Sequence, residues 1–356
     1  MSADPILVDT VNRLLTSTCG HEQVEAAETE GLNHAAWTAL SEAGFDRVGL
    51  AESAGGSGGT VQDMAAVLRT IGRHAAAVPV AETGFIAGWL LAELGMGLPA
   101  GAITIAERSP SSRADLVDGR LVGEVDAPWA RHCATVVVAV EVSAGLTVLS
   151  VPVDRSSLTP GANLAGEARD RLRIDLDVNS LEHVTVPSGP GLESLRAELD
   201  ARHLIARALL ASGALETVTR MSVEYTNARR QFGKPVATFQ AVQHHLVDLA
   251  ESAVMARMAA DVAVERLSRD TGSPRPVVFE AAAARIVVDD AIRVATAAAH
   301  QSHGAMGVTR EYSLQQFTRR LWSWRHEHGT TTSWERQLGS QMAEFGPDEL
   351  FATISG

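Results

Sequence analysis

The segment WRHEHGT, residues 324–330, places one carboxylate between two imidazoles near the end of the chain. Glu327 lies between His326 and His328, and a glycine and a threonine follow. A carboxylate beside imidazoles suits general acid–base catalysis, and two imidazoles can also bind a transition metal. The choice between a catalytic base, a metal site and a surface feature depends on the elements that position this segment.

A second group of reactive side chains lies in YTNARRQFGKPVATFQAVQHHLVDLA, residues 225–250. Arg229 and Arg230 end a helical pattern, and guanidinium groups bind phosphate oxygens through paired hydrogen bonds. Gly233 permits a tight turn and Pro235 stops the helix, so the sequence predicts a helix–helix corner. Taken alone, the segment is explained equally well as a structural corner whose basic residues stabilise a helix C-terminus.

The hydrophobic periodicity divides the chain into three parts. It is helical over residues 1–100, changes to six short β-branched runs over 101–190, and is helical again over 191–356. We therefore expect an α+β protein with an N-terminal helical domain, a middle β-domain and a C-terminal four-helix bundle. In the first domain, Thr60 and Asp63 have the spacing of a helix-capping box.

Two segments resemble signatures of the acyl-CoA dehydrogenase family. RRQFGKPVATFQAVQHHLVDLA is similar to the family pattern R-x-Q-F-G-K-P-x-x-x-F-Q-x-x-x-x-x-L-x-D. HQSHGAMGVTREYSLQQFTRR, residues 300–320, is similar to Q-x-x-G-G-x-G-x-x-x-E-Y-x-x-x-x-x-x-R. The domain order matches as well. The resemblance implies an FAD enzyme that dehydrogenates an acyl-CoA thioester, in which a glutamate takes the α-proton and the flavin takes the β-hydride.

The resemblance also implies that FAD is shared between subunits, because the C-terminal bundle of one family member binds the nucleotide half of its neighbour's FAD. We therefore expect a homo- or hetero-oligomer, a dimer or tetramer, with an acyl-CoA substrate and a separate electron acceptor. By the same resemblance, Arg229 would pair with the pyrophosphate. The other residues at the family's cofactor-binding positions are Gln231, Phe232, Gln240, Gln301, Gly304 and Thr330.

The catalytic positions depart from the family pattern. His328 falls where the family's Glu-Gly-Thr triplet places its base, and His203 falls where some members place the base instead. Glu327 is one residue away, so Glu327 and His328 are the predicted catalytic residues. The expected flavin loop reads AERSPSSRADL, which has Glu107 but no Gly-Ser-Asp, and Ala305 stands where the family usually has glycine.

Two functions follow from these departures. In the first, the chain itself is a catalytic FAD-dependent acyl-CoA dehydrogenase. In the second, it is a non-catalytic subunit that completes the FAD site of a partner in a hetero-oligomeric acyl-CoA dehydrogenase. Actinobacterial heterotetrameric members of the family, several of them associated with steroid side-chain degradation, are similar to the second description.

Composition excludes several other classes of protein. The formal net charge of −13 argues against nucleic acid and anionic membranes as main partners. Cys19 and Cys133 give no disulfide framework, and neither a signal peptide nor a membrane span is predicted, so we expect a cytoplasmic enzyme. The metal hypothesis would add His300 and His303 to the two loop histidines, but this spacing is weak and no metal is predicted.

Overall fold

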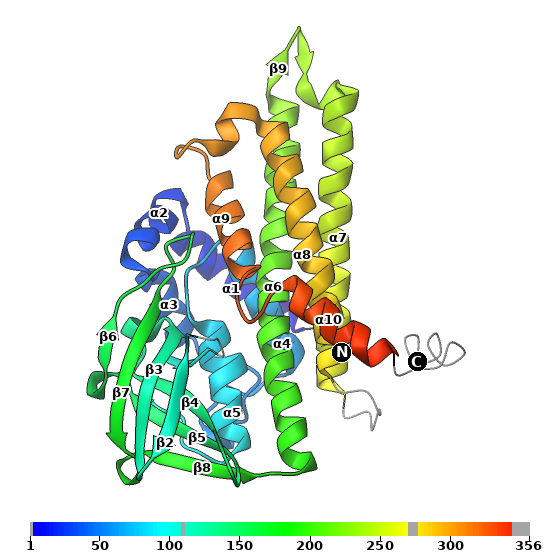
Figure 1. Cartoon of the computed structure of the whole chain (residues 1–356). Helices are drawn as coiled ribbons and strands as arrows, with labels where there is room; N and C mark the ends of the chain where they lie inside the picture. The colour runs from blue at the N-terminus through cyan, green and yellow to red at the C-terminus, as the bar shows by residue number, and fades with distance from the viewer. Residues whose placement is uncertain (1–2, 108–110, 270–276, 344–356) are drawn as a thin grey trace.

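The computed structural model describes residues 3–107, 111–269 and 277–343, and the structural statements below concern these residues. Helices come first, then two β-sheets, then long helices (Figure 1). The predicted α+β fold class is therefore confirmed, whereas the domain boundaries at 100 and 190 stay a prediction. None of the helices in this part of the chain is long and apolar enough to cross a membrane.

The N-terminal part is built from helices that begin and end at recognisable caps. Thr60 accepts a hydrogen bond from the Asp63 backbone N–H, and the Asp63 carboxylate accepts one from the Thr60 backbone N–H, which confirms the predicted capping box. The elements are α1 (Pro5–Thr18), α2 (His21–Glu30), α3 (His34–Glu42), α4 (Val61–Arg73), the π-helical segment η2 (Ala81–Gly88) and α5 (Trp89–Glu93).

The middle part consists of two four-stranded sheets that enclose a common apolar core. One sheet has the strand order β1 (Ile103–Ile105), β4 (Thr135–Val142), β5 (Gly145–Pro152) and β8 (Glu182–Pro187). The other has the order β2 (Arg113–Val117), β3 (Arg120–Pro128), β7 (Arg169–Asp177) and β6 (Ser157–Thr159). In β7, Leu172, Ile174 and Leu176 point inward in strict alternation with exposed residues, as a half-buried strand requires. The sequence predicted six of these strands and missed β2 and β6.

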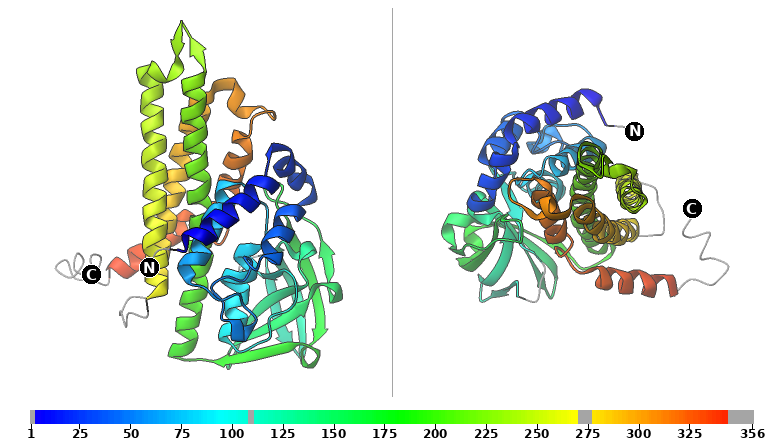
Figure 2. Two further views of the ribbon diagram at one scale, coloured as in Figure 1. Left: turned by 180° about the vertical axis from the view of Figure 1, so that it is seen from behind. Right: turned by 90° about the horizontal axis from the view of Figure 1, so that it is seen from above.

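The C-terminal part is organised around one very long helix, α6 (Pro190–Ala228). It starts beside β8 and runs the length of the molecule to the hairpin at the opposite end (Figures 1 and 2). The remaining helices are α7 (Gln240–Ser268), α8 (Val278–His303), α9 (Leu314–Trp324) and α10 (Thr331–Ala343). At about 1.5 Å per residue, α6 is roughly 58 Å long.

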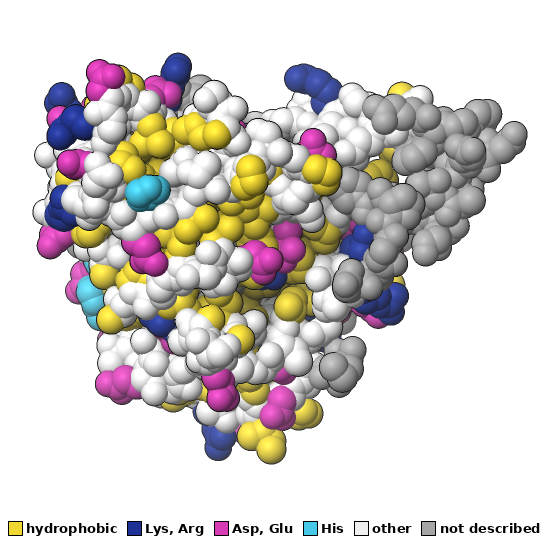
Figure 3. All heavy atoms as spheres, turned by 90° about the horizontal axis from the view of Figure 1, so that it is seen from below, with side chains coloured by type: hydrophobic (Ala, Val, Ile, Leu, Met, Phe, Trp, Pro, Cys, Tyr) yellow, Lys and Arg dark blue, Asp and Glu magenta, His cyan; other side chains and the backbone are white. Residues whose placement is uncertain are grey.

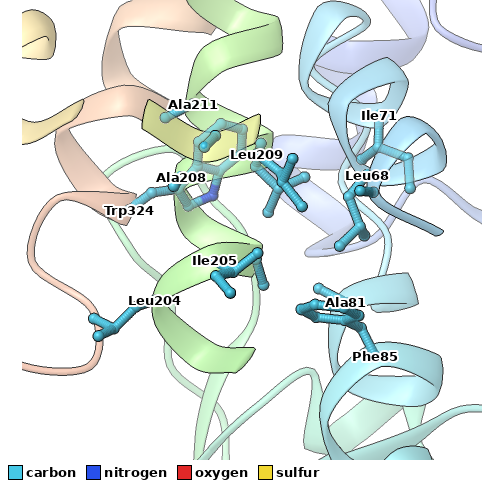
Figure 4. Close-up of a cluster of buried hydrophobic side chains, with 14 of the residues drawn as sticks. Leu68, Ile71, Ala81, Phe85, Leu204, Ile205, Ala208, Leu209, Ala211 and Trp324 are labelled. Atoms are coloured by element: carbon cyan, nitrogen blue, oxygen red, sulfur yellow. The ribbon is translucent and has the colours of Figure 1, made fainter. Parts of the chain in front are cut away.

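Helix α6 also lies directly against α4, and glycines allow this close approach. A Cβ atom added at Gly213 would lie 2.0 Å from the Arg69 carbonyl oxygen, and one at Gly72 would lie 2.0 Å from the Leu210 carbonyl oxygen. The side chains of α4, η2, α6 and α9 meet in one core, where Trp324 packs near Leu209 (Figure 4). This packing fixes the end of α9 and thus the loop that follows it.

Candidate functional site

The predicted corner after α6 is a two-residue hairpin that projects beyond the helical bundle (Figure 1). β9 (Arg230–Gln231) pairs with β10 (Lys234–Pro235). Phe232 and Gly233, which join them, have positive φ angles of 51° and 81°. Two successive residues with positive φ are typical of the tightest hairpin turns, so Gly233 lies at the turn as predicted.

The side chains predicted to bind the nucleotide face solvent around this hairpin. Phe232 is 91% exposed, and Arg229, Gln231 and Gln240 are exposed as well. The salt bridges within the described residues do not include Arg229. A guanidinium and two amides whose side chains have no hydrogen-bond partner among the described residues form a donor set suited to phosphate and ribose oxygens.

The second family-like segment lies at the same end of the bundle. The ring of Tyr225, one turn before Arg229, stacks on His303 at the end of α8 with 4.6 Å between centroids. Gln301 and Gly304 are exposed there. Gly304 has a φ of 59°, and an added Cβ would meet no atom within 4 Å. The fold thus brings the two motifs together on one open surface.

The two histidines at the family's alternative base positions also meet, but deep in the molecule. His203 of α6 and His328 of the loop after α9 stack face to face, with ring centroids 4.1 Å apart and planes 5° apart. Nε2 of His328 lies 3.3 Å from Oδ1 of Asp200. Burial lowers the pKa of His328 although Asp200 opposes the shift. His328 also has a φ of 55°, a strained backbone conformation for a non-glycine residue.

Glu327 has an arginine on each carboxylate oxygen. Its Oε1 accepts hydrogen bonds from Nη2 and Nε of Arg169, at 2.5 and 2.9 Å. Its Oε2 lies 2.6 Å from Nε of Arg207, as an ion pair without hydrogen-bond alignment. Burial opposes ionisation, but the two arginines outweigh it and hold the pKa of Glu327 below its ordinary value. A base needs a pKa near the working pH, and these surroundings move the pKa of Glu327 away from it.

The contacts of Glu327 extend into a cluster of buried charges that joins all three parts of the chain. Arg207 also pairs with Glu82 of η2 at 2.7 Å, and Arg169 pairs with Glu167 at 3.2 Å. Arg320 of α9 lies 3.4 Å from the second oxygen of Glu167. These partners of Glu327 were not predicted from the sequence. The signal was present for Arg207, since an arginine inside the apolar stretch LIARALLASGAL must be paired if that stretch is buried.

Two cavities adjoin this cluster. The large cavity, about 590 Å³, is lined by residues that include Glu107, Asp126, Asn163, Arg169, His326 and Glu327. The small cavity, about 70 Å³, is lined by apolar side chains together with Glu107, Asp200, His203 and His328. No group of three or more metal-binding side chains with metal-site geometry occurs in the described parts of the chain.

Thr330, predicted to lie near FAD, has a local structural role at the start of α10. Its hydroxyl accepts a hydrogen bond from the Ser333 backbone N–H at 3.2 Å, and its own N–H donates to the Ser333 hydroxyl at 3.0 Å. These reciprocal bonds are those of a helix N-cap. Thr330 and the base positions lie far from Arg229, because His203 and Arg229 are roughly 39 Å apart along α6.

Comparisons with known proteins agree with this architecture. The family model described as "Acyl-CoA dehydrogenase, N-terminal domain" matches residues 4–96, and "Acyl-CoA dehydrogenase, C-terminal domain" matches residues 197–342. The chain belongs to the acyl-CoA dehydrogenase family.

Individual relatives cover nearly the whole chain. Acyl-CoA dehydrogenase IpdE2 of Mycobacterium tuberculosis is 28% identical over 88% of this chain and 89% of its own length. The ChsE4-ChsE5 complex of Mycobacterium tuberculosis contains a chain with a TM-score of 0.84 and 22% identity, covering 96% of this chain and 97% of that one. A variant of the Tcur3481-Tcur3483 steroid ACAD gives a TM-score of 0.80 and 22% identity, with 95% and 97% coverage. The two structural matches show a shared fold.

The residues present fit FAD unequally in the two regions, the hairpin after α6 and the buried region around His203 and His328. The donor set around the hairpin suits the nucleotide half of the cofactor. The small cavity, where the two base positions meet, is far below the roughly 300 Å³ at which ligand pockets begin. The large cavity has sufficient volume, but the sequence after Glu107 in its lining lacks the family's Gly-Ser-Asp of the flavin loop. The flavin half of a family site is therefore poorly matched by this chain's own residues.

Proposed function

We propose that this chain is one subunit of a heteromeric FAD-dependent acyl-CoA dehydrogenase, and that its hairpin end completes the FAD site of a partner subunit. In this role Arg229 binds the pyrophosphate, while Gln231, Phe232 and Gln240 contact the nucleotide. Gln301 and Gly304 border the same surface. When bound, FAD supplies the hydride acceptor for α,β-dehydrogenation.

The observation that carries this proposal is the unequal use of polar groups at the two ends of α6. Arg229 and Gln231 are exposed and have no salt-bridge partner within the described chain, whereas Glu327 is buried between two arginines. Roughly 39 Å of helix separates the two regions, so one dinucleotide cannot contact both within a single chain. A second subunit must therefore contribute the flavin half.

The surface of α7 supports assembly into an oligomer. Five large apolar side chains are more than half exposed along one side of this helix, and these are Val247, Val254, Met255, Met258 and Val262. Hydrophobic side chains also form a band across the face seen from below in Figure 3. Exposed apolar surface of this extent is typical of subunit interfaces. The likeness to the ChsE4-ChsE5 complex and to a steroid ACAD supports a heteromer that acts on a bulky, steroid-derived acyl-CoA.

We further propose that Glu327 is a positioning residue and not the catalytic base. Its two ion pairs hold Arg169 of β7 and Arg207 of α6 in place. The second candidate function, a chain that is catalytic alone, would then depend on His328. The contact between His328 and Asp200 supports this second function, because a carboxylate can orient an imidazole for proton transfer.

The absorbance spectrum of purified protein separates the two functions. We expect the chain expressed alone to be colourless, and the chain co-expressed and co-purified with a candidate acyl-CoA dehydrogenase partner to show a flavin spectrum. The electron acceptor is then identified from reoxidation of the reduced pair. A yellow, active protein obtained from this chain alone would overturn the heteromer proposal.

A further inference from the structure

We propose that Glu107 is a proton-accepting residue for an acyl thioester bound in the large cavity of this same chain, and that it exchanges the α-proton without any flavin. The thioester class of the ligand rests on the proposed function. The proton transfer itself rests on the position of Glu107 and the groups around it.

Glu107 lies between the two cavities. Of the described residues, it alone lines both the large cavity and the small one. It lies two residues after the end of β1, and its backbone N–H donates a 2.7 Å hydrogen bond to the carbonyl oxygen of Asp126 in β3. Because β1 and β3 belong to different sheets, this bond fixes the backbone of Glu107 between them.

The other carboxylates of the large cavity are already used. Asp126 pairs with Arg171 at 2.8 Å, Asp170 pairs with Arg131 at 2.5 Å, and Glu327 is held between its two arginines. Glu107 forms no ion pair with another described residue. It is therefore the carboxylate of this lining that is free to accept a proton from a ligand.

The surroundings tune Glu107 for proton transfer near neutral pH. Burial and the negative charge of Glu327 raise the pKa of Glu107 to about 7, and the nearby arginines limit the rise. The charged groups that act on it from neighbouring elements are Glu327 after α9, Arg169 of β7, Arg207 of α6 and Glu82 of η2. The other titratable groups that line the two cavities are Asp126, Asp170 and His326 in the large one and Asp200, His203 and His328 in the small one.

The chemistry balances without an oxidant. The Cα–H bond of the acyl thioester breaks, its electron pair stays on the acyl group as an enolate, and the proton moves to a carboxylate oxygen of Glu107. Arg169, in the lining of the same cavity, uses only one of its two Nη1 N–H groups for a described residue, the Ala168 carbonyl, so the other can donate to the thioester oxygen on which charge develops. Return of a proton from Glu107, after exchange with solvent, restores the starting thioester.

The test is deuterium exchange by the full chain in D₂O, with octanoyl-CoA and 3-cyclohexylpropanoyl-CoA as probes. We expect mass spectrometry to show deuterium gain at the α-carbon above the rate without protein. Glu107→Gln should lower this rate by about 100-fold or more, as loss of a general base does. Glu124→Gln, a change at an exposed carboxylate of β3 outside both cavities, is the matched control and should leave the rate unchanged.

The pH profile provides an independent readout. The rate should rise with pH through about 7 and then level off, because Glu107 accepts a proton only when it is ionised. Absence of exchange with both probes, an equal rate in Glu107→Gln, or a rate independent of pH between 5 and 9 would overturn the proposal. If Glu107→Gln does not fold, the pH profile of the unmodified chain decides. Exchange is measured without flavin, so its failure is distinct from failure of the chain to complete a partner's FAD site.

Discussion

The hairpin end of α6 and the loop after α9 both carry residues at family functional positions, but they differ in what those residues contact. At the hairpin, Arg229 is exposed and pairs with no other described residue. In the loop, Glu327 is buried and paired twice, and His328 is stacked on His203. Exposed polar groups are available to a ligand, whereas buried and paired groups stabilise the fold. This difference supports the proposal that the hairpin end completes a shared FAD site, whereas Glu327 and its arginine partners serve the fold.

The largest effect that distinguishes the two regions is expected at Glu327. Replacing Glu327 with alanine should lower the free energy of unfolding by about 3 kcal/mol, because it leaves the charges of Arg169 and Arg207 buried and less well paired. Chemical denaturation monitored by circular dichroism measures this. Glu335→Ala, at an exposed position of α10, is the matched control and should change stability by less than about 0.5 kcal/mol.

The pH dependence of stability checks the same ion pairs. The pKa of Glu327 is lowered in the folded chain, so its contribution is present above its ordinary value of 4.5 and is lost as pH falls below that value. The stability difference between the unmodified chain and Glu327→Ala should therefore shrink at acidic pH. A difference that stays constant from pH 7 down to the limit of folding would contradict the role of the ion pairs.

Sequence patterns predicted the elements better than they predicted the contacts of the loop. The long helices and six of the strands follow from hydrophobic period, and the hairpin follows from Gly233 and Pro235. β2 and β6 were missed because they lack alternating runs of β-branched residues, having the sequences RADLV and SLT. Counting residues from the two family motifs identified His203 and His328 as two separate base positions. Their stacking, and the pairing of Glu327 with Arg169 more than 150 residues away, depend on tertiary packing that no local pattern contains.

A smaller effect, on binding and not on folding, is expected at Arg229. Arg229→Ala in the co-purified complex should weaken FAD binding by roughly 2 kcal/mol, because charge-assisted hydrogen bonds to the pyrophosphate are lost. Retained flavin per complex after dilution and gel filtration measures this. Arg293→Ala, at an exposed position of α8, is the matched control. Unchanged flavin retention in Arg229→Ala would remove the main support for the hairpin as a cofactor site.

The smallest effect is expected at Thr330. It tests whether this residue acts like the cofactor-binding residues of the hairpin or like the structural residues of the loop after α9. Thr330→Ala removes the hydroxyl that caps α10, so stability should fall by about 0.5 to 1 kcal/mol. Thr330→Ser keeps the hydroxyl and should retain most of the stability. If Thr330 acts only as a cap, flavin retention in the complex is the same for both variants. If instead Thr330→Ala loses flavin while its thermal unfolding is unchanged, Thr330 contacts the cofactor, and the loop after α9 still takes part in the shared FAD site.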